Sequence, residues 1–368
     1  MLYKQMGPAY TAYSIKKERC PAADDMENKL FLQTPRRKTA YYRLGEGNRK
    51  ALVLVHGNAS SSAFFFPTMY ALSERYDVIA PDLNGFGDTE QSPIHSPTAL
   101  MDWAEDLHAF TQALGLTQFA LLGWSLGGGV AMRYAILHPQ SLTHLLLMAP
   151  MSPYGFGGTK GADGQMYDER GWGSPGGFAN PQFLEKLAEK DDSGDPMAAR
   201  SVLEKSLFAN GYTVSGQWQD LYVQEVFKMP IGPDYYAGDY EALPAFPYVL
   251  PGQRGISNAL APQWANVTAI QDITPKPPIL WIRGDADRLV SDQSGSDLAV
   301  LGMAGYIPGY PGADAFPPQP MIAQTRAVLD RYARKGGRYE EVVMEGVAHA
   351  PHLEQPDAFV AAVAKFLG

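Results

Sequence analysis

The sequence predicts an α/β fold in which a mostly parallel, doubly wound sheet is covered by helices on both faces. Apolar segments of strand length alternate with segments of helical periodicity over residues 30–150, and this alternation returns over residues 273–368. The order is typical of parallel sheets, because a helix usually carries the chain back between two parallel strands. The stretch between the two halves is rich in Gly, Pro, Tyr and Trp, and it indicates an insertion into the fold.

The strands are predicted from short apolar runs bounded by turn-forming residues. The runs that suit buried parallel strands are ALVLVHG (51–57), YDVIAPDL (76–83), FALLGWS (119–125), HLLLMAP (144–150), PPILWIRGD (277–285) and YEEVVME (339–345). Two earlier runs, KLFLQT (29–34) and KTAYYRLG (38–45), are predicted to form an antiparallel hairpin at one edge of the sheet.

The helices are predicted from apolar residues that recur at intervals of three and four. In residues 98–116 these are Leu100, Trp103, Leu107, Phe110 and Leu114. The other predicted core helices cover residues 126–139, 324–337 and 356–368. Proline or glycine stands at the ends of these segments, where both residues are favoured.

These elements divide the chain into a core that an insertion interrupts. The predicted units are an N-terminal arm (1–34), the first part of the core (35–152), a mainly helical cap (153–272) and the second part of the core (273–368). Cap helices are predicted at 181–190, 195–210 and 217–229, the second with Asp195 as N-cap and Pro196 as its first residue. A loop insertion at 301–321 holds too many glycines and prolines for regular elements.

Charge and cysteine content narrow the classes of function. The formal net charge is −9 and no basic run exceeds Arg36-Arg37-Lys38, so neither nucleic acid nor a membrane is an expected partner. Cys20 is the only cysteine, which excludes an intramolecular disulfide and a cysteine-based zinc site, and we expect it to be unreactive. No run reaches the length of a bilayer-spanning helix, and the first residues lack the apolar region of a secretory signal. We therefore expect a cytoplasmic protein.

A G-x-S-x-G motif, Gly123-Trp124-Ser125-Leu126-Gly127, joins a predicted strand to a predicted helix. A serine on such a sharp turn stands at the carboxyl end of the sheet, beside the N-terminus of the helix. There the N–H of Leu126 can stabilise a developing oxyanion. The alternative is a glycine-rich turn with an idle serine, but the strand-to-helix context favours a nucleophile.

A serine nucleophile needs a base, and two histidines late in the chain are candidates. His349 directly follows the strand that ends at Glu345-Gly346, and His352 lies about one turn further on. We favour His349, because its loop should lie beside the nucleophile. A metal-binding pair is a poor alternative, since nothing nearby completes a ligand set.

The third member of such a triad orients the histidine and stabilises its protonated form. Asp285 and Asp287 follow the carboxyl end of the 277–285 strand, and the order Ser, Asp, His fits a nucleophile-elbow architecture. Either aspartate could serve, and Asp285 could instead cap the turn.

His56-Gly57-Asn58 follows the first parallel strand. The residue after Gly57 is well placed to give the second N–H that an oxyanion requires. His56 itself is expected to be a structural turn residue, whereas the amide side chain of Asn58 could also reach a substrate.

The motifs HGN (56–58), PDLNGFGDT (81–89), GWSLGG (123–128), GDADRLV (284–290) and GVAHAPHLEQPDAF (346–359) resemble those of the α/β-hydrolase superfamily, in order and position. The resemblance covers residues 35–152 and 273–368. It implies Ser125 as nucleophile, Asp287 as acid and His349 as base.

The resemblance also implies that the backbone N–H groups of Asn58 and Leu126 form the oxyanion hole, and that Asp82, Gly85 and Gly87 are structural. Two features depart from the family pattern. The interval between Asp287 and His349 is unusually long, because the 301–321 loop intervenes, and the large cap does not indicate a subfamily.

The expected activity is serine hydrolysis of a small, fairly apolar carboxylic ester or lactone. Haloalkane dehalogenases and epoxide hydrolases need a carboxylate where this chain has Ser125, and proline iminopeptidases carry HGGPG in place of HGN. Carbon–carbon bond hydrolases, amidases and peptidases use the same triad and stay open as alternatives. A non-enzymatic binding protein would normally show a damaged triad.

The substrate pocket is expected to be aromatic, with walls from the cap and from the 301–321 loop. The candidate substrate-binding residues are Trp124, Phe64, Phe65, Tyr306 and Tyr310. The sequence contains no metal, nucleotide or flavin motif, so we expect neither a metal nor another cofactor. It does not indicate an oligomeric state.

Overall fold

The structure is a computed structural model that describes residues 4–5 and 28–368. The prediction that Cys20 is unreactive, and most of the predicted N-terminal arm, lie outside the described residues. Among the described residues, no helix combines the length and the apolar character that crossing a bilayer requires.

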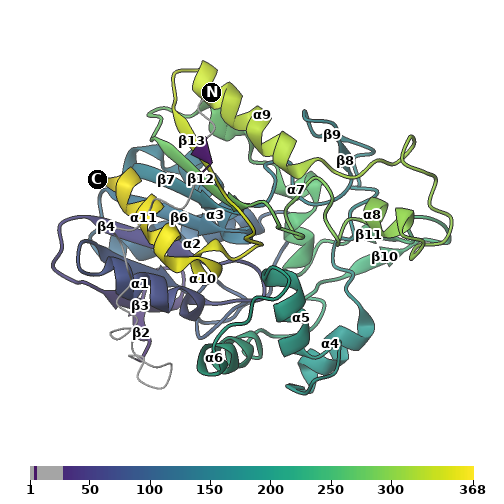
Figure 1. The fold of residues 1–368 in the computed structure, drawn as a ribbon, viewed down its shortest axis with the longest axis horizontal. Coiled ribbons are helices and arrows are strands. Elements are labelled where there is room, and N and C mark those ends of the chain that lie inside the picture. Colours follow the sequence, from purple (N-terminus) through teal and green to yellow (C-terminus); the bar gives the residue numbers. More distant parts are fainter. Residues whose placement is uncertain (1–3, 6–27) are drawn as a thin grey trace.

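A nine-stranded, mostly parallel sheet forms the core, in the order β1-β13-β12-β7-β6-β4-β5-β3-β2 (Figure 1). The strands are β1 (Lys4–Gln5), β2 (Leu30–Gln33), β3 (Lys38–Leu44), β4 (Ala51–Val55), β5 (Asp77–Pro81), β6 (Phe119–Trp124), β7 (Leu142–Met148), β12 (Ile279–Gly284) and β13 (Tyr339–Met344). Only the pairs β2–β3 and β3–β5 are antiparallel. The predicted fold class and the edge hairpin are therefore confirmed.

Helices cover both faces of this sheet. They are α1 (Phe66–Leu72), α2 (Ala99–Ala113), α3 (Leu126–Leu137), α9 (Met321–Arg334), α10 (Pro351–Glu354) and α11 (Pro356–Leu367). The chain moves from β4 to β5 through α1, and then reverses direction across the sheet through α2 to reach β6. Because such crossovers are right-handed, α1 lies on one face and α2 on the other. The helices α1 and α10 were not among the sequence predictions, whereas the others were.

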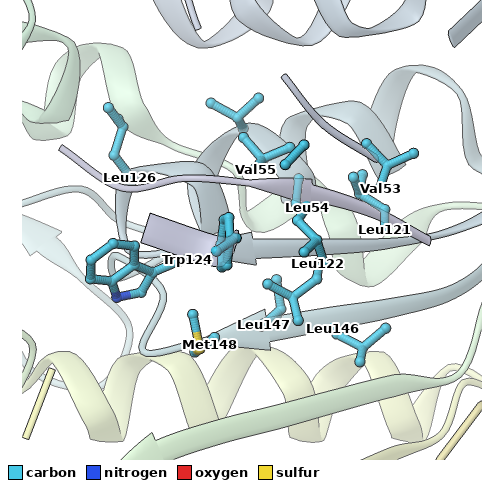
Figure 2. Packing of buried hydrophobic residues seen from close by; sticks show 14 of the residues in the cluster. Val53, Leu54, Val55, Leu121, Leu122, Trp124, Leu126, Leu146, Leu147 and Met148 are labelled. Atoms are coloured by element: carbon cyan, nitrogen blue, oxygen red, sulfur yellow. The ribbon is translucent and has the colours of Figure 1, made fainter. Parts of the chain in front are cut away.

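The centre of the sheet is apolar on both faces. All residues of β5 and β6 are buried, in keeping with the continuous apolar runs of their sequences. Figure 2 shows side chains from β4, β6 and β7, such as Leu54, Leu122 and Leu147, packed against one another. This core fixes the strand ends from which the candidate catalytic residues emerge.

The cap contains short helices and two small hairpins. Its elements are β8 (Thr159–Lys160), β9 (Gln165–Met166), α4 (Pro181–Ala188), α5 (Ala199–Leu207), α6 (Gly216–Val226), β10 (Tyr240–Ala242), β11 (Val249–Pro251) and α7 (Pro262–Ala265). Short 3₁₀ helices occur in both parts of the protein. Those of the core are η2 (Ser62–Phe65) and η3 (Pro139–Ser141), and those of the cap are η4 (Ser257–Leu260) and η5 (Thr268–Asp272). In Figure 1, α4, α5 and α6 lie apart from the sheet and its covering helices.

Two local predictions need correction. The helix α5 begins at Ala199, so Asp195 is not its N-cap. Instead, the Asp195 carboxylate accepts a hydrogen bond from the Met197 N–H at 2.8 Å and closes a turn before the helix. The 301–321 insertion is not wholly irregular, because α8 (Leu298–Met303) extends into its first residues. Residues 304–320 contain no helix or strand, as predicted.

Gly127 gives a direct test of how closely α3 packs against the sheet. A Cβ atom at this position would lie 2.3 Å from the Val55 carbonyl oxygen. We therefore expect Gly127→Ala to lower the free energy of unfolding by about 1–3 kcal/mol, despite the better helix propensity of alanine. Urea denaturation followed by circular dichroism measures the change.

The matched control for this variant is Gly194→Ala. Gly194 has open space around its Cβ position and no positive φ, so alanine there should leave stability unchanged or slightly higher. Equal stability of the two variants would contradict the packing argument.

Candidate active site

Ser125 occupies a tight turn between β6 and α3. Its backbone lies in a sparsely populated region, with φ 55° and ψ −118°, a conformation that costs about 1–3 kcal/mol. The Ser125 N–H donates to the Met148 carbonyl at 3.0 Å, and the Ser125 carbonyl accepts from the Met151 N–H at 3.0 Å. These bonds to the end of β7 and the residues beyond it hold the serine in its strained geometry.

His349 and Asp287 are brought together from two different loops. The His349 Nδ1 and the Asp287 Oδ2 lie 2.8 Å apart, and both side chains are almost fully buried. The other carboxylate oxygen of Asp287 accepts the N–H groups of Leu289 at 2.8 Å and Val290 at 3.0 Å. An ionised carboxylate in this position favours the tautomer with a proton on Nδ1, which leaves Nε2 free to accept one.

The main chain of His349 is also held on both sides. Its N–H donates to the Leu207 carbonyl at the end of α5 at 3.0 Å. Its carbonyl accepts the indole N–H of Trp124 at 2.8 Å. The candidate base is therefore anchored both to the cap and to the residue that precedes the candidate nucleophile.

The structure separates the paired candidates left by the sequence. The Asp285 carboxylate accepts the N–H of Gly346 at 2.7 Å, so it joins the turn after β12 to the turn after β13 rather than capping its own turn. His352 is fully buried and does not line the cavity that contains His349. Neither ring nitrogen of His352 has a hydrogen-bond partner among the described residues. Burial lowers the pKa of His352 to about 3.

His56 occupies the structural role expected of it. Its Nε2 accepts the Leu83 N–H at 3.0 Å, and its Nδ1 lies 2.8 Å from the Gly57 carbonyl. This pattern places the ring proton on Nδ1. Burial lowers the pKa of His56, which keeps the ring neutral. The histidine therefore fixes the loop that carries Asn58.

Asn58 and Leu126 line the same cavity as Ser125 and His349. Leu126 is the first residue of α3, so its N–H has no acceptor within the helix. The Asn58 side-chain oxygen accepts the N–H of Ala59 at 2.9 Å, so this oxygen already has a local partner. The backbone N–H groups of Asn58 and Leu126 are thus the candidate oxyanion donors.

The shared cavity has a volume of about 780 Å³, within the usual range for small-molecule sites. Its walls come from the core, the cap and the 301–321 loop. Lining residues from the cap and the loop include Phe178, Phe183, Leu203, Tyr236, Leu301, Tyr306 and Ile307. Among the described residues, no Asp, Glu, Lys or Arg lines this cavity.

The predicted substrate-binding residues divide into two groups. Trp124 and Tyr306 line the cavity. Phe64 and Phe65 do not line it, and both are fully buried in the core. Tyr310 also lies outside the lining, since it packs beside Phe316 and donates to the Phe316 carbonyl at 2.8 Å. Two of the five aromatic residues selected from the sequence therefore line the cavity, and the other three belong to the core and to a separate cluster.

The sequence analysis expected walls from the cap but did not name the individual cap residues that form them. Phe183 on α4 and Leu203 on α5 line the cavity, and both lie in segments whose helices were predicted. The apolar faces of these amphipathic helices were the available signal. Tyr236 lies in an irregular segment, and no pattern in the sequence distinguishes it.

A sequence profile of the alpha/beta hydrolase fold matches residues 50–309. The chain belongs to the α/β-hydrolase family. The family assignment agrees with the sheet order and with the strand-to-helix turn at Ser125.

Parts of the chain are similar to curated proteins. It is 39% identical over 100 residues to 1-acylglycerol-3-phosphate O-acyltransferase from Arabidopsis thaliana, covering 26% of this chain and 24% of that protein. It is 32% identical over 154 residues to 2-hydroxymuconate semialdehyde hydrolase from Pseudomonas putida, covering 42% of this chain and 52% of that protein. The chain thus matches only about a quarter to a half of these relatives.

Solved structures of the family share the fold over nearly the whole chain. Carboxylesterase CesB from Bacillus subtilis superposes with a TM-score of 0.56 at 16% identity, covering 94% of this chain and 93% of that chain. At this level of identity the likeness concerns the fold alone.

The two aspartates near His349 give a matched pair of variants. We expect Asp287→Asn to lower hydrolytic activity by about a thousandfold or more, because the amide stabilises the wrong tautomer of the histidine. Asp285→Asn removes a turn contact and should lower activity far less. Steady-state kinetics on an activated ester measures both variants, and a greater loss in Asp285→Asn would reassign the acid.

The buried His352 predicts a pH dependence of stability. Its pKa in the folded protein is lowered to about 3. As the pH falls from about 6.5 to this value, the histidine becomes protonated in the unfolded chain but stays neutral in the folded protein. The free energy of unfolding should therefore fall by up to about 1.4 kcal/mol per pH unit below 6.5 because of this residue. His352→Phe should flatten the dependence measured by urea denaturation from pH 7 to pH 4. Parallel curves for the two proteins would contradict the assignment.

Proposed function

We propose that this protein is a serine hydrolase that cleaves a small, uncharged carboxylic ester or lactone through an acyl-enzyme intermediate on Ser125. The observation that carries the proposal is the 2.8 Å contact between His349 and Asp287, with Ser125 and His349 facing one cavity. A serine at a strand-to-helix turn, a histidine and a buried carboxylate together supply a nucleophile, a base and the group that orients the base.

In this mechanism, the free Nε2 of His349 removes the proton from the Ser125 hydroxyl as the oxygen attacks the carbonyl carbon. The tetrahedral oxyanion receives hydrogen bonds from the N–H groups of Asn58 and Leu126. Collapse of this intermediate expels the alcohol, which takes the proton from His349. Water then attacks the acyl-enzyme with His349 again acting as base, and the carboxylic acid and free Ser125 are released.

The cavity chemistry supports an uncharged substrate. No charged side chain of the described residues lines it, so a charged acyl or alcohol group would lose its hydration without gaining an ionic partner. Apolar residues from both the core and the cap, such as Met151, Leu203 and Leu260, form much of the wall. An apolar acyl group gains free energy by burial there.

Hydrolysis of carbon–carbon or amide bonds is the alternative, because either reaction could use the same three residues. The Pseudomonas relative is named as a hydrolase of 2-hydroxymuconate semialdehyde. This similarity favours carbon–carbon cleavage over amide hydrolysis as the alternative. The substrate panel below separates these reactions.

We expect the purified protein to hydrolyse neutral esters and lactones more efficiently than amides, carbon–carbon cleavage substrates or esters of similar size that carry a carboxylate. Ser125→Ala should reduce turnover by several orders of magnitude, up to about a millionfold. A fluorophosphonate should label Ser125 of the wild type, as peptide mass spectrometry can show.

Each outcome of this panel discriminates between the hypotheses. Labelling of a different serine would overturn the nucleophile assignment. Preference for a carboxylate-bearing ester would overturn the argument from the uncharged cavity, and faster cleavage of a carbon–carbon substrate would favour the alternative.

A further inference from the structure

The ammonium group of Lys29 lies at the meeting point of three carboxylates. Its Nζ is 2.8 Å from oxygens of Asp82, Asp88 and Glu225. The Lys29 side chain is only 5% exposed, and those of Asp82 and Glu225 are buried. A lysine has three N–H donors, and here each donor has one carboxylate. This cluster lies outside the residues that line the catalytic cavity.

Two of these carboxylates hold the segment that contains Asn58, which we call the oxyanion loop (residues 56–62). Asp82 accepts both the N–H of Ser62 at 2.9 Å and its hydroxyl at 2.6 Å. Glu225, on the cap helix α6, accepts the hydroxyl of Ser61 at 2.6 Å. The oxyanion loop is therefore fixed from the core by Asp82 and from the cap by Glu225.

Lys29 makes this arrangement electrostatically possible. Oxygens of Asp82, Asp88 and Glu225 lie within 4.8 Å of one another, and buried like charges at such distances repel strongly. Burial alone would raise the pKa of Asp82, but the charge of Lys29, together with other neighbouring groups such as the Asp88 N–H that donates to this carboxylate, lowers it. Burial likewise opposes the charge on Lys29, and the neighbouring Asp82 and Glu225 raise its pKa above the ordinary value.

The nearby Lys228 does not duplicate this role. Its Nζ contacts Asp88 and Glu225 at 2.7 Å, but no contact joins it to Asp82. Its side chain is 37% exposed, so its ion pairs are screened by solvent and should contribute little. Lys228 is therefore a matched control that shares Asp88 and Glu225 with Lys29 but does not contact Asp82, the carboxylate that holds Ser62.

We propose that Lys29 positions the oxyanion loop by joining Asp82 of the core to Glu225 of the cap. The inference rests on the proposed function, because the loop carries the Asn58 N–H. Without Lys29, the two carboxylates that hold Ser61 and Ser62 would repel each other. The loop would then lose its fixed position, and the oxyanion donor would be displaced with it.

The test compares Lys29→Ala with Lys228→Ala on a small activated ester. We expect Lys29→Ala to lower kcat by about ten- to a hundredfold, because a displaced oxyanion donor loses most of its effect. KM should stay within about threefold, since the cavity walls are unchanged. Lys228→Ala should stay within about threefold of the wild type in both constants. Equal kcat values for the two variants would overturn the proposal.

Chemical rescue tests whether the positive charge itself is needed. n-Propylammonium replaces the atoms that Lys29→Ala removes, and n-propanol is a neutral control of similar size. We expect the ammonium ion to raise the kcat of Lys29→Ala by at least about threefold, and the alcohol to leave it unchanged. The ion should have no such effect on the wild type or on Lys228→Ala. Equal responses to ammonium and alcohol would overturn the role assigned to charge.

Hydrogen exchange gives a readout that does not depend on activity. Peptides that cover residues 56–62 should exchange faster in Lys29→Ala than in the wild type or in Lys228→Ala, while peptides from β6 should not change. If Lys29→Ala does not fold, Ser62→Ala serves instead, since it removes one bond to Asp82 and leaves every charge in place. Unchanged exchange in the loop overturns the positioning role, whether or not the protein hydrolyses esters.

Faster exchange without any loss of kcat would overturn the catalytic importance of the loop position. Faster exchange in a protein whose wild type hydrolyses none of the panel would support the link between Lys29 and the loop, and would instead overturn the proposed function.

Discussion

The backbone of Ser125 lies in an unfavourable region because β6 ends and α3 begins at this one residue. This constraint organises the residues around it. The abrupt start of the helix brings α3 so close to the sheet that Gly127 has no room for a side chain beside Val55. It also places the first free N–H of α3 in the same cavity as the serine hydroxyl. The strain is offset by hydrogen bonds from Ser125 to the end of β7 and beyond.

The sheet and the main candidate residues could be predicted because local pattern and position agree. A parallel strand buried on both faces is apolar throughout, as β6 is. Ser125, Asp287 and His349 each follow a strand closely, and the carboxyl ends of parallel strands lie at one edge. The structure accordingly places the histidine and Asp287 within hydrogen-bond distance, although a long loop separates them in the chain.

The pocket walls could not be predicted in the same way, because an aromatic side chain suits a core as well as a cavity. Phe64 stacks on Tyr222 of α6, with ring centres 4.2 Å apart, and is thereby removed from the cavity. Tyr310 packs beside Phe316 instead. The role of Lys29 escaped notice because its three partners are distant in sequence, and the charge pattern around it marks no motif.

The hydrogen bond between the His349 N–H and the Leu207 carbonyl also limits how the cap can move. Lifting the end of α5 would pull directly on the candidate base, so a substrate cannot be admitted there without disturbing the proton-transfer geometry. Phe178 and Tyr306 also line the cavity, yet they are 41% and 77% exposed. They mark the solvent-facing rim, and traffic of substrate and product across that rim leaves the histidine undisturbed. The hydrogen bond at Leu207 thus ties the histidine side of the cap to the candidate base, whereas the rim at Phe178 and Tyr306 is open to solvent.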